Sequence, residues 1–141
     1  MQTEYLIKKY EGCKLRAYKC PKGIWTIGWG STFYEDGRPV KEGDVISQEK
    51  ADYLLNHYIA TYIYTVVNLM KKKFTNEQKA ALYSLIYNWG PDGFRKSKLY
   101  QAIKNDDYAE ICRQWDFGFK NNLKGLFKRR TEELYLFIKD V

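Results

Sequence analysis

The sequence predicts a mainly helical α+β domain, in which a small antiparallel β-lobe and a helical lobe are joined by a long helix. Two observations predict this class. Residues 14–34 combine β-favouring side chains with closely spaced glycines, which is typical of short antiparallel strands and tight turns. After residue 47, apolar side chains recur at three- and four-residue steps, which is the period of amphipathic helices.

The length and composition indicate one domain over residues 1–141. The 45% hydrophobic and 29% charged residues are typical of a globular chain. A chain of this length buries roughly two-thirds of its unfolded surface. We place the β-lobe at about residues 13–46, the linking helix at about 47–70 and the helical lobe at about 74–141, together with the N-terminal helix.

The first residues predict a short helix from the N-cap Thr3 to the breaker Gly12. Glu11 therefore lies in the last turn, where the helix dipole favours the protonated carboxyl group. Taken alone, this residue would be a solvated surface glutamate. Its interest comes from the residues that lie downstream of it.

Three short strands are predicted after this helix. The first leads to a turn at residues 20–23, whose sequence is Cys-Pro-Lys-Gly, and the second covers residues 24–29. Residues 33–34 suggest a third strand, closed by the Asp-Gly signal at 36–37. A sheet this small is marginal alone and needs a helix to pack on.

Capping residues predict where the helices of the second part of the chain begin. Polar residues that cap helices precede each apolar period. The linking helix is expected to start at Ser47, and the next helix at a capping box over Thr75 and Gln78. Further helices are expected to start at Ser97 and at Asp106 or Asp107. A loop at 118–124 precedes a last helix at 125–138.

The net charge of +7, from 24 Lys and Arg against 17 Asp and Glu, favours a polyanionic partner. Nucleic acid, acidic lipid and bacterial wall polymers all meet that description, and a solvated basic surface without a partner is an equal alternative. Charge alone therefore does not decide the function.

The residue inventory leaves few kinds of chemistry. The three cysteines, Cys13, Cys20 and Cys112, lack metal-ligand spacing, and the single histidine is His57, so no metal site is predicted. Phosphate-loop, G-x-S-x-G and H-E-x-x-H motifs are missing. The remaining candidates are a carboxylate, Glu11, with the Cys20 thiol and the Thr26 hydroxyl downstream of it.

The spacing of these three residues resembles a known family. Glu11, Cys20 and Thr26 frame the segment AYKCPKGIWTIGWGST (residues 17–32), which is similar to the motif of the phage-type lysozymes of glycoside hydrolase family 24, the T-even and lambdoid phage muramidases. The segments at residues 76–99 and 125–137 resemble two further blocks of that family, in the same order. The resemblance therefore covers nearly the whole chain.

The resemblance implies a lysozyme-like fold with the active site in a cleft between the lobes, and Glu11, Cys20 and Thr26 as catalytic residues. Two departures stand out. Gly30-Ser31-Thr32 replaces the family's common Gly-His-Thr, so an expected histidine is missing. Cys20 stands where the best-known members have aspartate.

Glycoside hydrolysis needs an acid for the leaving oxygen and a water or a nucleophile at the anomeric carbon. Glu11 is the predicted general acid, and Thr26 is expected to hold the water on the opposite face of the sugar. Cys20 can act as a base, as an electrostatic support or as a covalent nucleophile; we favour water attack with inversion and Cys20 in support. A Cys13–Cys20 disulfide that silences the site is a disfavoured alternative.

The family positions also imply residues that bind or orient. Arg129 or Arg130 is expected to pair with Glu11 or with a neighbouring acid. Trp115 is left open between sugar stacking and the core. The expected sugar-binding residues are Tyr87, Asn88, Ser97 and Trp29.

The predicted function is that of an endolysin, a muramidase that cleaves the β-1,4 bond between N-acetylmuramic acid and N-acetylglucosamine in peptidoglycan, without a cofactor. The N-terminus is too polar for a signal peptide, and no apolar run reaches membrane-spanning length. We therefore expect no membrane anchor, and we expect a monomer. The resemblance implies that the protein stays in the host cytoplasm until a holin releases it. The alternatives are a lytic transglycosylase and a basic nucleic-acid-binding module; nucleic acid is not the expected partner.

Overall fold

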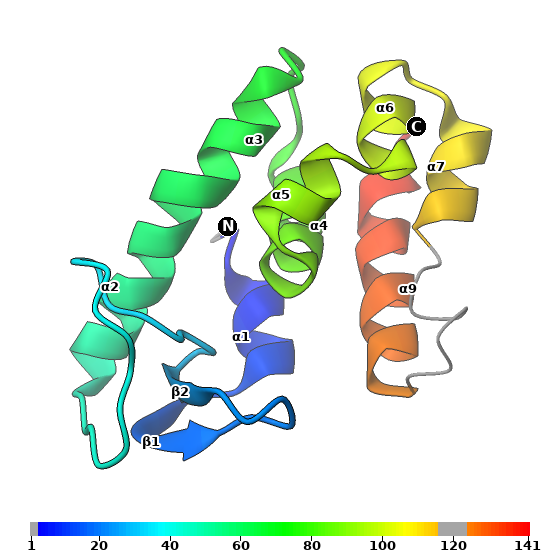
Figure 1. The fold of residues 1–141 in the computed structure, drawn as a ribbon. Coiled ribbons are helices and arrows are strands. Elements are labelled where there is room, and N and C mark those ends of the chain that lie inside the picture. Colours follow the sequence, from blue (N-terminus) through cyan, green and yellow to red (C-terminus); the bar gives the residue numbers. More distant parts are fainter. Residues whose placement is uncertain (1–2, 116–123) are drawn as a thin grey trace. The chain divides into compact units, whose positions relative to one another are not determined.

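The computed structural model describes residues 3–115 and 124–141 (Figure 1). Its contacts divide the chain into two compact units. Unit 1 consists of Met1–Leu6 and Ile63–Val141, and unit 2 is Ile7–Tyr62. Most of the loop expected at 118–124 lies outside the described residues. The elements are mainly helical with one small antiparallel sheet, which confirms the predicted fold class.

Unit 2 carries the sheet. Helix α1 (Tyr5–Glu11), whose first two residues belong to unit 1, is followed by strands β1 (Lys14–Lys19) and β2 (Trp25–Gly28). The strands pair antiparallel, with a register shift between Lys14 and Tyr18. The third predicted strand is wrong: Phe33 forms only an isolated bridge with Pro39, because the chain turns back within residues 34–38.

A tight turn over residues 20–24 joins the two strands. The Cys20 amide donates to the Ile24 carbonyl at 3.0 Å, and the Gly23 amide donates to the Cys20 carbonyl at 2.8 Å. Gly23 has a φ of +78°, a conformation that glycine adopts without a steric penalty. The turn predicted at residues 20–23 is therefore formed, and it holds the Cys20 side chain at the end of the hairpin.

The long helix begins as predicted, with the Ser47 hydroxyl accepting the Lys50 amide at 3.0 Å. It is not one regular α-helix, however. It consists of α2 (Gln48–Tyr58), a π-helical turn η1 (Ile59–Ile63) and α3 (Tyr64–Leu69).

The π-helical turn follows from the spacing of the apolar residues. Leu55, Ile59 and Ile63 are all buried at steps of four, and each such step drifts by about 40° around an α-helix. A wider turn offsets this drift, so that the three side chains stay on one buried face.

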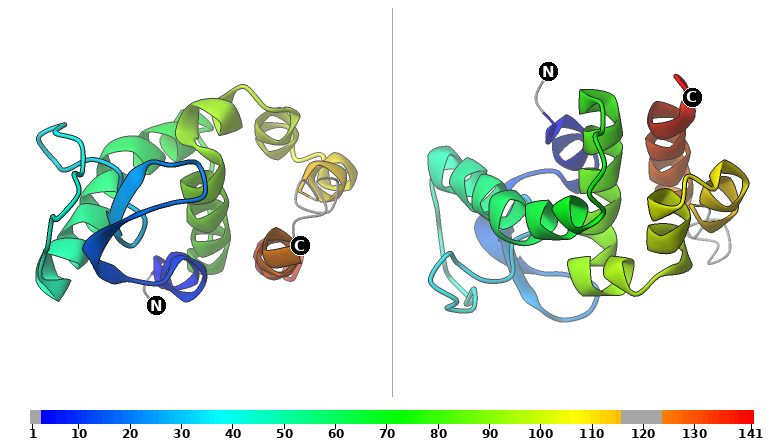
Figure 2. Two further views of the ribbon diagram at one scale, coloured as in Figure 1. Left: turned by 60° about the horizontal axis from the view of Figure 1, so that its bottom comes forward. Right: turned by 90° about the horizontal axis from the view of Figure 1, so that it is seen from above.

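Unit 1 is helical. Figure 2 gives two further views of its helices, of which α4 packs mainly against α9 and α6 against α7. The Thr75–Gln78 capping box is confirmed, and Ser97 and Asp107 cap the helices that follow them. The helices are α4 (Asn76–Trp89), α5 (Pro91–Arg95), α6 (Lys98–Lys104), α7 (Tyr108–Gln114) and α9 (Lys124–Ile138).

Two kinds of feature are absent from the described residues. Within residues 3–115 and 124–141, no helix is both long and apolar enough to cross a membrane. In the same part of the chain, no group of three or more His, Cys, Asp or Glu side chains is placed to hold a metal ion.

Candidate active site

Glu11 is the last residue of α1 and is half-buried. Gly12 ends the helix, with a φ of +69° and its amide 3.4 Å from the Lys8 carbonyl. A left-handed residue at this position is a common way to end a helix. It turns the chain directly into β1, so that the carboxylate and the hairpin belong to the same unit.

Cys20 is a free, half-buried thiol at the end of this hairpin. Hydrogen bonds from the backbone amides of Ile24 and Lys22, and one from the Thr26 hydroxyl, lower its pKa, although partial burial opposes them. Donors aimed at the sulfur favour the thiolate. The turn therefore prepares Cys20 to carry a negative charge.

Thr26 lies in the middle of β2, and only 4% of it is exposed. Its Oγ1 is 3.0 Å from the Ile24 carbonyl oxygen, to which it donates. The same hydroxyl is also within hydrogen-bonding reach of Cys20. Because a hydroxyl has one proton and two lone pairs, Thr26 can donate to one of these groups and still accept a hydrogen bond from water.

Tyr18 is a residue of this site that the sequence reasoning missed. It pairs with Thr26 across the β1–β2 ladder, so the two side chains share one face of the sheet. Burial raises the pKa of Tyr18, and the negative charges of Glu11 and Cys20 raise it further. The phenol therefore lies within electrostatic range of both groups. The signal was its position in strand β1, two residues before Cys20.

Trp29 is held by polar contacts within unit 2. Its Nε1 donates to Asp52 Oδ1 at 2.8 Å, and the Lys8 ammonium lies 5.4 Å from the centre of its ring. The indole hydrogen bond is the main reason that the pKa of Asp52 is lowered. These contacts tie the end of β2 to α2 and fix the orientation of the indole.

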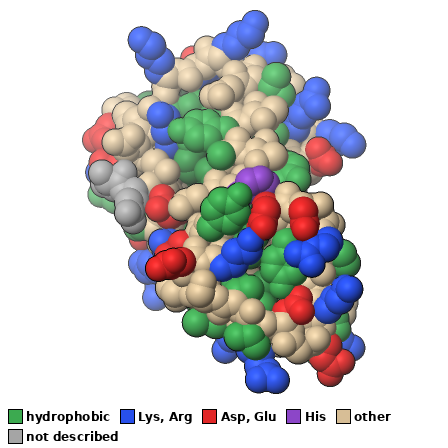
Figure 3. Space-filling model, turned by 90° about the vertical axis from the view of Figure 1, so that its left-hand side faces the viewer, with side chains coloured by type: hydrophobic (Ala, Val, Ile, Leu, Met, Phe, Trp, Pro, Cys, Tyr) green, Lys and Arg blue, Asp and Glu red, His purple; other side chains and the backbone are tan. Residues whose placement is uncertain are grey.

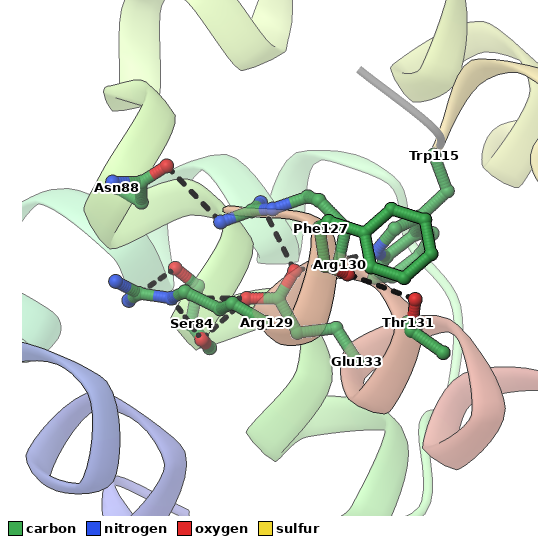
Figure 4. Close-up of polar contacts among 8 residues, drawn as sticks. All are labelled: Ser84, Asn88, Trp115, Phe127, Arg129, Arg130, Thr131 and Glu133. Atoms are coloured by element: carbon green, nitrogen blue, oxygen red, sulfur yellow. Dashed lines mark hydrogen bonds and ion pairs between the residues drawn. The ribbon is translucent and has the colours of Figure 1, made fainter. Parts of the chain in front are cut away.

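Arg129 and Arg130 belong to a buried polar cluster in unit 1 (Figure 4). Arg129 Nε lies 3.4 Å from Glu133 Oε2, and Arg130 Nη1 lies 3.0 Å from Glu133 Oε1. The sequence left two kinds of partner open for these arginines. The structure gives both of them a neighbouring acid, Glu133, which sequence reasoning did not single out.

Ser84 and Trp115 complete the cluster. The Ser84 hydroxyl donates to Glu133, and Trp115 Nε1 donates to the same carboxylate at 3.3 Å. Burial raises the pKa of Glu133, and Arg130, Ser84, Arg129 and Trp115 oppose that effect. Trp115 is fully buried, with its ring 5.0 Å from that of Phe137. It is therefore a core residue and not a sugar-stacking one.

The expected sugar-binding residues of unit 1 lie on α4 and at the start of α6. Tyr87 is half-buried, and Asn88 is exposed in the last turn of α4. Ser97 uses its hydroxyl locally, because it donates to the Phe94 carbonyl at 2.6 Å and accepts from the Tyr100 amide at 3.1 Å. Ser97 is thus primarily a helix cap.

Glu11, Cys20, Thr26 and Trp29 all belong to unit 2, in which Thr26 lies within hydrogen-bonding reach of Cys20, and Tyr18 lies within electrostatic range of Cys20 and Glu11. The remaining predicted residues, Tyr87, Asn88, Ser97, Arg129 and Arg130, lie in unit 1. All three cysteines are free, and the Cys13 sulfur contacts Gln48 at 3.6–3.8 Å. A Cys13–Cys20 disulfide is therefore not present.

The face of the molecule in Figure 3 does not show a basic patch for nucleic acid. Figure 3 shows one face of the molecule, on which Lys and Arg side chains lie scattered among Asp, Glu and hydrophobic side chains. Recognition of a phosphate backbone relies on basic side chains gathered in a stripe or patch. The face in view lacks that arrangement.

The chain is similar to known proteins over nearly its whole length. The family model described as phage lysozyme matches residues 8–133. An endolysin of Acyrthosiphon pisum secondary endosymbiont phage 1 is 36% identical over 139 residues, with 94% of this chain and 92% of that protein covered. A SAR-endolysin of Enterobacteria phage P21 is 32% identical over 126 residues, which are 87% and 74% of the two chains. Among solved structures, the muramidase domain of SpmX from Asticaccaulis excentricus has a TM-score of 0.79 at 29% identity, covering 96% of this chain and 94% of that one.

Proposed function

Because the chain belongs to the phage lysozyme family, we propose that it is an endolysin that hydrolyses the β-1,4 bond between N-acetylmuramic acid and N-acetylglucosamine in peptidoglycan. One observation carries the proposal for this site. A half-buried carboxylate, a thiol of lowered pKa and a buried hydroxyl lie around Tyr18 in a single unit. This arrangement offers an acid and a water-activating pair, which glycoside hydrolysis requires.

Glu11 is the general acid of the proposed reaction. Its carboxyl group gives a proton to the glycosidic oxygen as the bond from that oxygen to the anomeric carbon breaks. The sugar that keeps the anomeric carbon passes through an oxocarbenium-like state. A negative charge nearby stabilises this state, and the Cys20 thiolate supplies one.

Water completes the reaction. The Thr26 hydroxyl accepts a hydrogen bond from a water molecule on the opposite face of the sugar, and the water oxygen bonds to the anomeric carbon. The Cys20 thiolate takes the proton that the water loses and then releases it to solvent, and solvent returns a proton to Glu11. This sequence inverts the anomeric configuration and consumes one water for each bond cleaved.

Sugar contacts outside the reacting groups are proposed for Trp29 in unit 2 and for Tyr87, Asn88 and Ser97 in unit 1. The Ser97 contact is the weakest of these, because its hydroxyl already caps α6. Arg129 and Arg130 are proposed to orient polar groups on α4 (Asn76–Trp89) through the contacts of the buried cluster.

The proposed substrate, the bacterial cell wall, also suggests where the protein acts. We propose that the protein waits in the host cytoplasm as a monomer and reaches the wall after a holin opens the membrane. The net charge of +7 favours its association with an anionic wall. Nucleic acid has no place in this proposal.

Clearing of isolated cell walls tests the proposal. Glu11→Gln should lower the rate by about 10²- to 10⁴-fold, because the general acid is lost, whereas the matched change Glu42→Gln at an exposed position should leave the rate unchanged. Clearing that persists in Glu11→Gln would refute the lysozyme function. Clearing that survives in Cys20→Ala, at a reduced rate, excludes Cys20 as a covalent nucleophile. Mass spectrometry of the products separates hydrolysis from transglycosylation, which leaves an anhydro-sugar end.

A further inference from the structure

The side-chain amide of Asn88 has a fixed polarity. Arg130 Nη2 lies 3.0 Å from Asn88 Oδ1, and a guanidinium group has only donors. The oxygen of the amide must therefore face Arg130, and its NH2 group must point away. Figure 4 shows this arrangement, with the Asn88 oxygen turned toward Arg130 and the nitrogen on the opposite side.

Arg130 cannot easily give up this orientation. Only 2% of its side chain is exposed, and its Nη1 is 3.0 Å from the fully buried Glu133. Glu133 is in turn held by Ser84 and Trp115. A flipped Asn88 amide would place two donors against each other, and the buried carboxylate keeps the arginine from moving aside.

The NH2 group of Asn88 is available for a ligand. Asn88 is exposed in the last turn of α4, and within the part of the chain that the structure describes, its side chain is held by Arg130 through the oxygen. An amide whose oxygen faces a buried guanidinium turns its NH2 group toward a ligand on the exposed side. Asn88 therefore selects for a carbonyl, carboxylate or hydroxyl oxygen.

We propose that Arg130 and Glu133 are positioning residues that make Asn88 a hydrogen-bond donor to the acetamido carbonyl of a substrate sugar, and that they thereby favour N-acetylated over de-N-acetylated glycan. The proposal rests on the proposed function. An acetamido group offers a carbonyl oxygen to the Asn88 donor. A de-N-acetylated sugar presents an ammonium group at the same position, which has only donors and cannot pair with the outward NH2 group of Asn88.

The decisive variant is Asn88→Asp. It keeps the shape of the side chain and an oxygen for Arg130, so the buried cluster stays paired, but it replaces the outward donor by an acceptor. The substrates are isolated walls, the same walls after chemical de-N-acetylation, and those walls after re-N-acetylation. The readout is kcat/KM for new reducing ends on each substrate. Asn68→Asp is the matched control, since Asn68 is also exposed and the charge change is identical.

The wild type should prefer acetylated walls, and Asn88→Asp should lose about tenfold in kcat/KM on them, the size of one good hydrogen bond. On de-N-acetylated walls the variant should lose little, so the acetylation preference should shrink toward one. Equal losses on both substrates, or an unchanged preference, would overturn the proposal. A wild type that cleaves no wall at all would refute the proposed function instead, so the two failures are distinguishable.

The positioning role has its own readout. Arg130→Lys keeps the positive charge beside Glu133 but loses the planar fork that reaches both Glu133 and Asn88. Its acetylation preference should fall while its KM for de-N-acetylated walls stays near the wild-type value. An unchanged preference in folded Arg130→Lys would contradict the role of Arg130. If this variant does not fold, the Asn88→Asp result alone decides.

Discussion

The buried cluster around Glu133 predicts a large loss of stability when its charge is removed. Glu133→Gln keeps the volume of the side chain but replaces one acceptor oxygen of the carboxylate by an NH2 donor. It removes the negative charge that Arg129 and Arg130 both contact, and these arginines are only 4% and 2% exposed. The perturbation is therefore electrostatic and not a cavity.

The magnitude follows from the burial. Breaking a buried ion pair by removing one partner costs about 3–5 kcal/mol, because a charge is left without compensation. For 141 residues, an unfolding entropy of about 2.1 cal/mol/K per residue gives about 0.3 kcal/mol/K for the chain. The expected decrease in Tm is therefore about 10–17 °C.

Calorimetry of the wild type and Glu133→Gln measures this shift. Glu110→Gln is the matched control, because Glu110 pairs with Arg113 at 2.7 Å on the surface, where ion pairs contribute little. The control should unfold near the wild-type temperature. A Glu133→Gln protein that unfolds within about 3 °C of the wild type, roughly 1 kcal/mol, would refute the reasoning that this carboxylate compensates two buried arginines.

Three further predictions concern unit 2. Because the pKa of Cys20 is lowered, the rate of wall clearing should rise with pH as the thiolate forms. In Cys20→Asp, whose carboxyl group has an ordinary pKa of about 3.9, this rise should occur at lower pH. A pH profile that does not move would exclude Cys20 as the titrating base. Gly28 has a φ of +65°, and an added Cβ would lie 3.3 Å from the Cβ of Ala51. Gly28→Ala should therefore lower the free energy of unfolding in urea by at least about 1–2 kcal/mol. An unchanged free energy of unfolding would contradict the strained geometry. Trp29→Phe removes the main cause of the lowered pKa of Asp52, so that pKa should rise in an NMR titration, and an unchanged value would contradict the assigned hydrogen bond.

Local signals explain why part of the site is predictable from sequence. The spacing of Glu11, Cys20 and Thr26 depends on a helix end and a tight turn, both of which glycines and proline specify locally. The caps at Thr75 and Ser97 are equally local, because a side-chain oxygen and an amide three residues away form them. Such features need no knowledge of the tertiary structure.

The missed features depend on packing between segments. In the sequence Glu133 is an ordinary helical glutamate, and only the approach of α9 to α4 places it beside Ser84. The importance of Tyr18 comes from burial and from the nearness of Glu11. The expected third strand failed because residues near Phe33 have no continuous partner strand, which β-favouring side chains cannot reveal.

The most direct test of the central claim is the product of a single bond cleavage in ¹⁸O-labelled water. If Glu11 protonates the leaving oxygen and a water held near Thr26 and Cys20 attacks, each new reducing end should carry one ¹⁸O. The first-formed anomer of the new reducing end should be α, which NMR can record before mutarotation. The Glu11→Gln variant should form almost none of this product. An anhydro end without ¹⁸O, or a β-anomer formed first, would contradict the account.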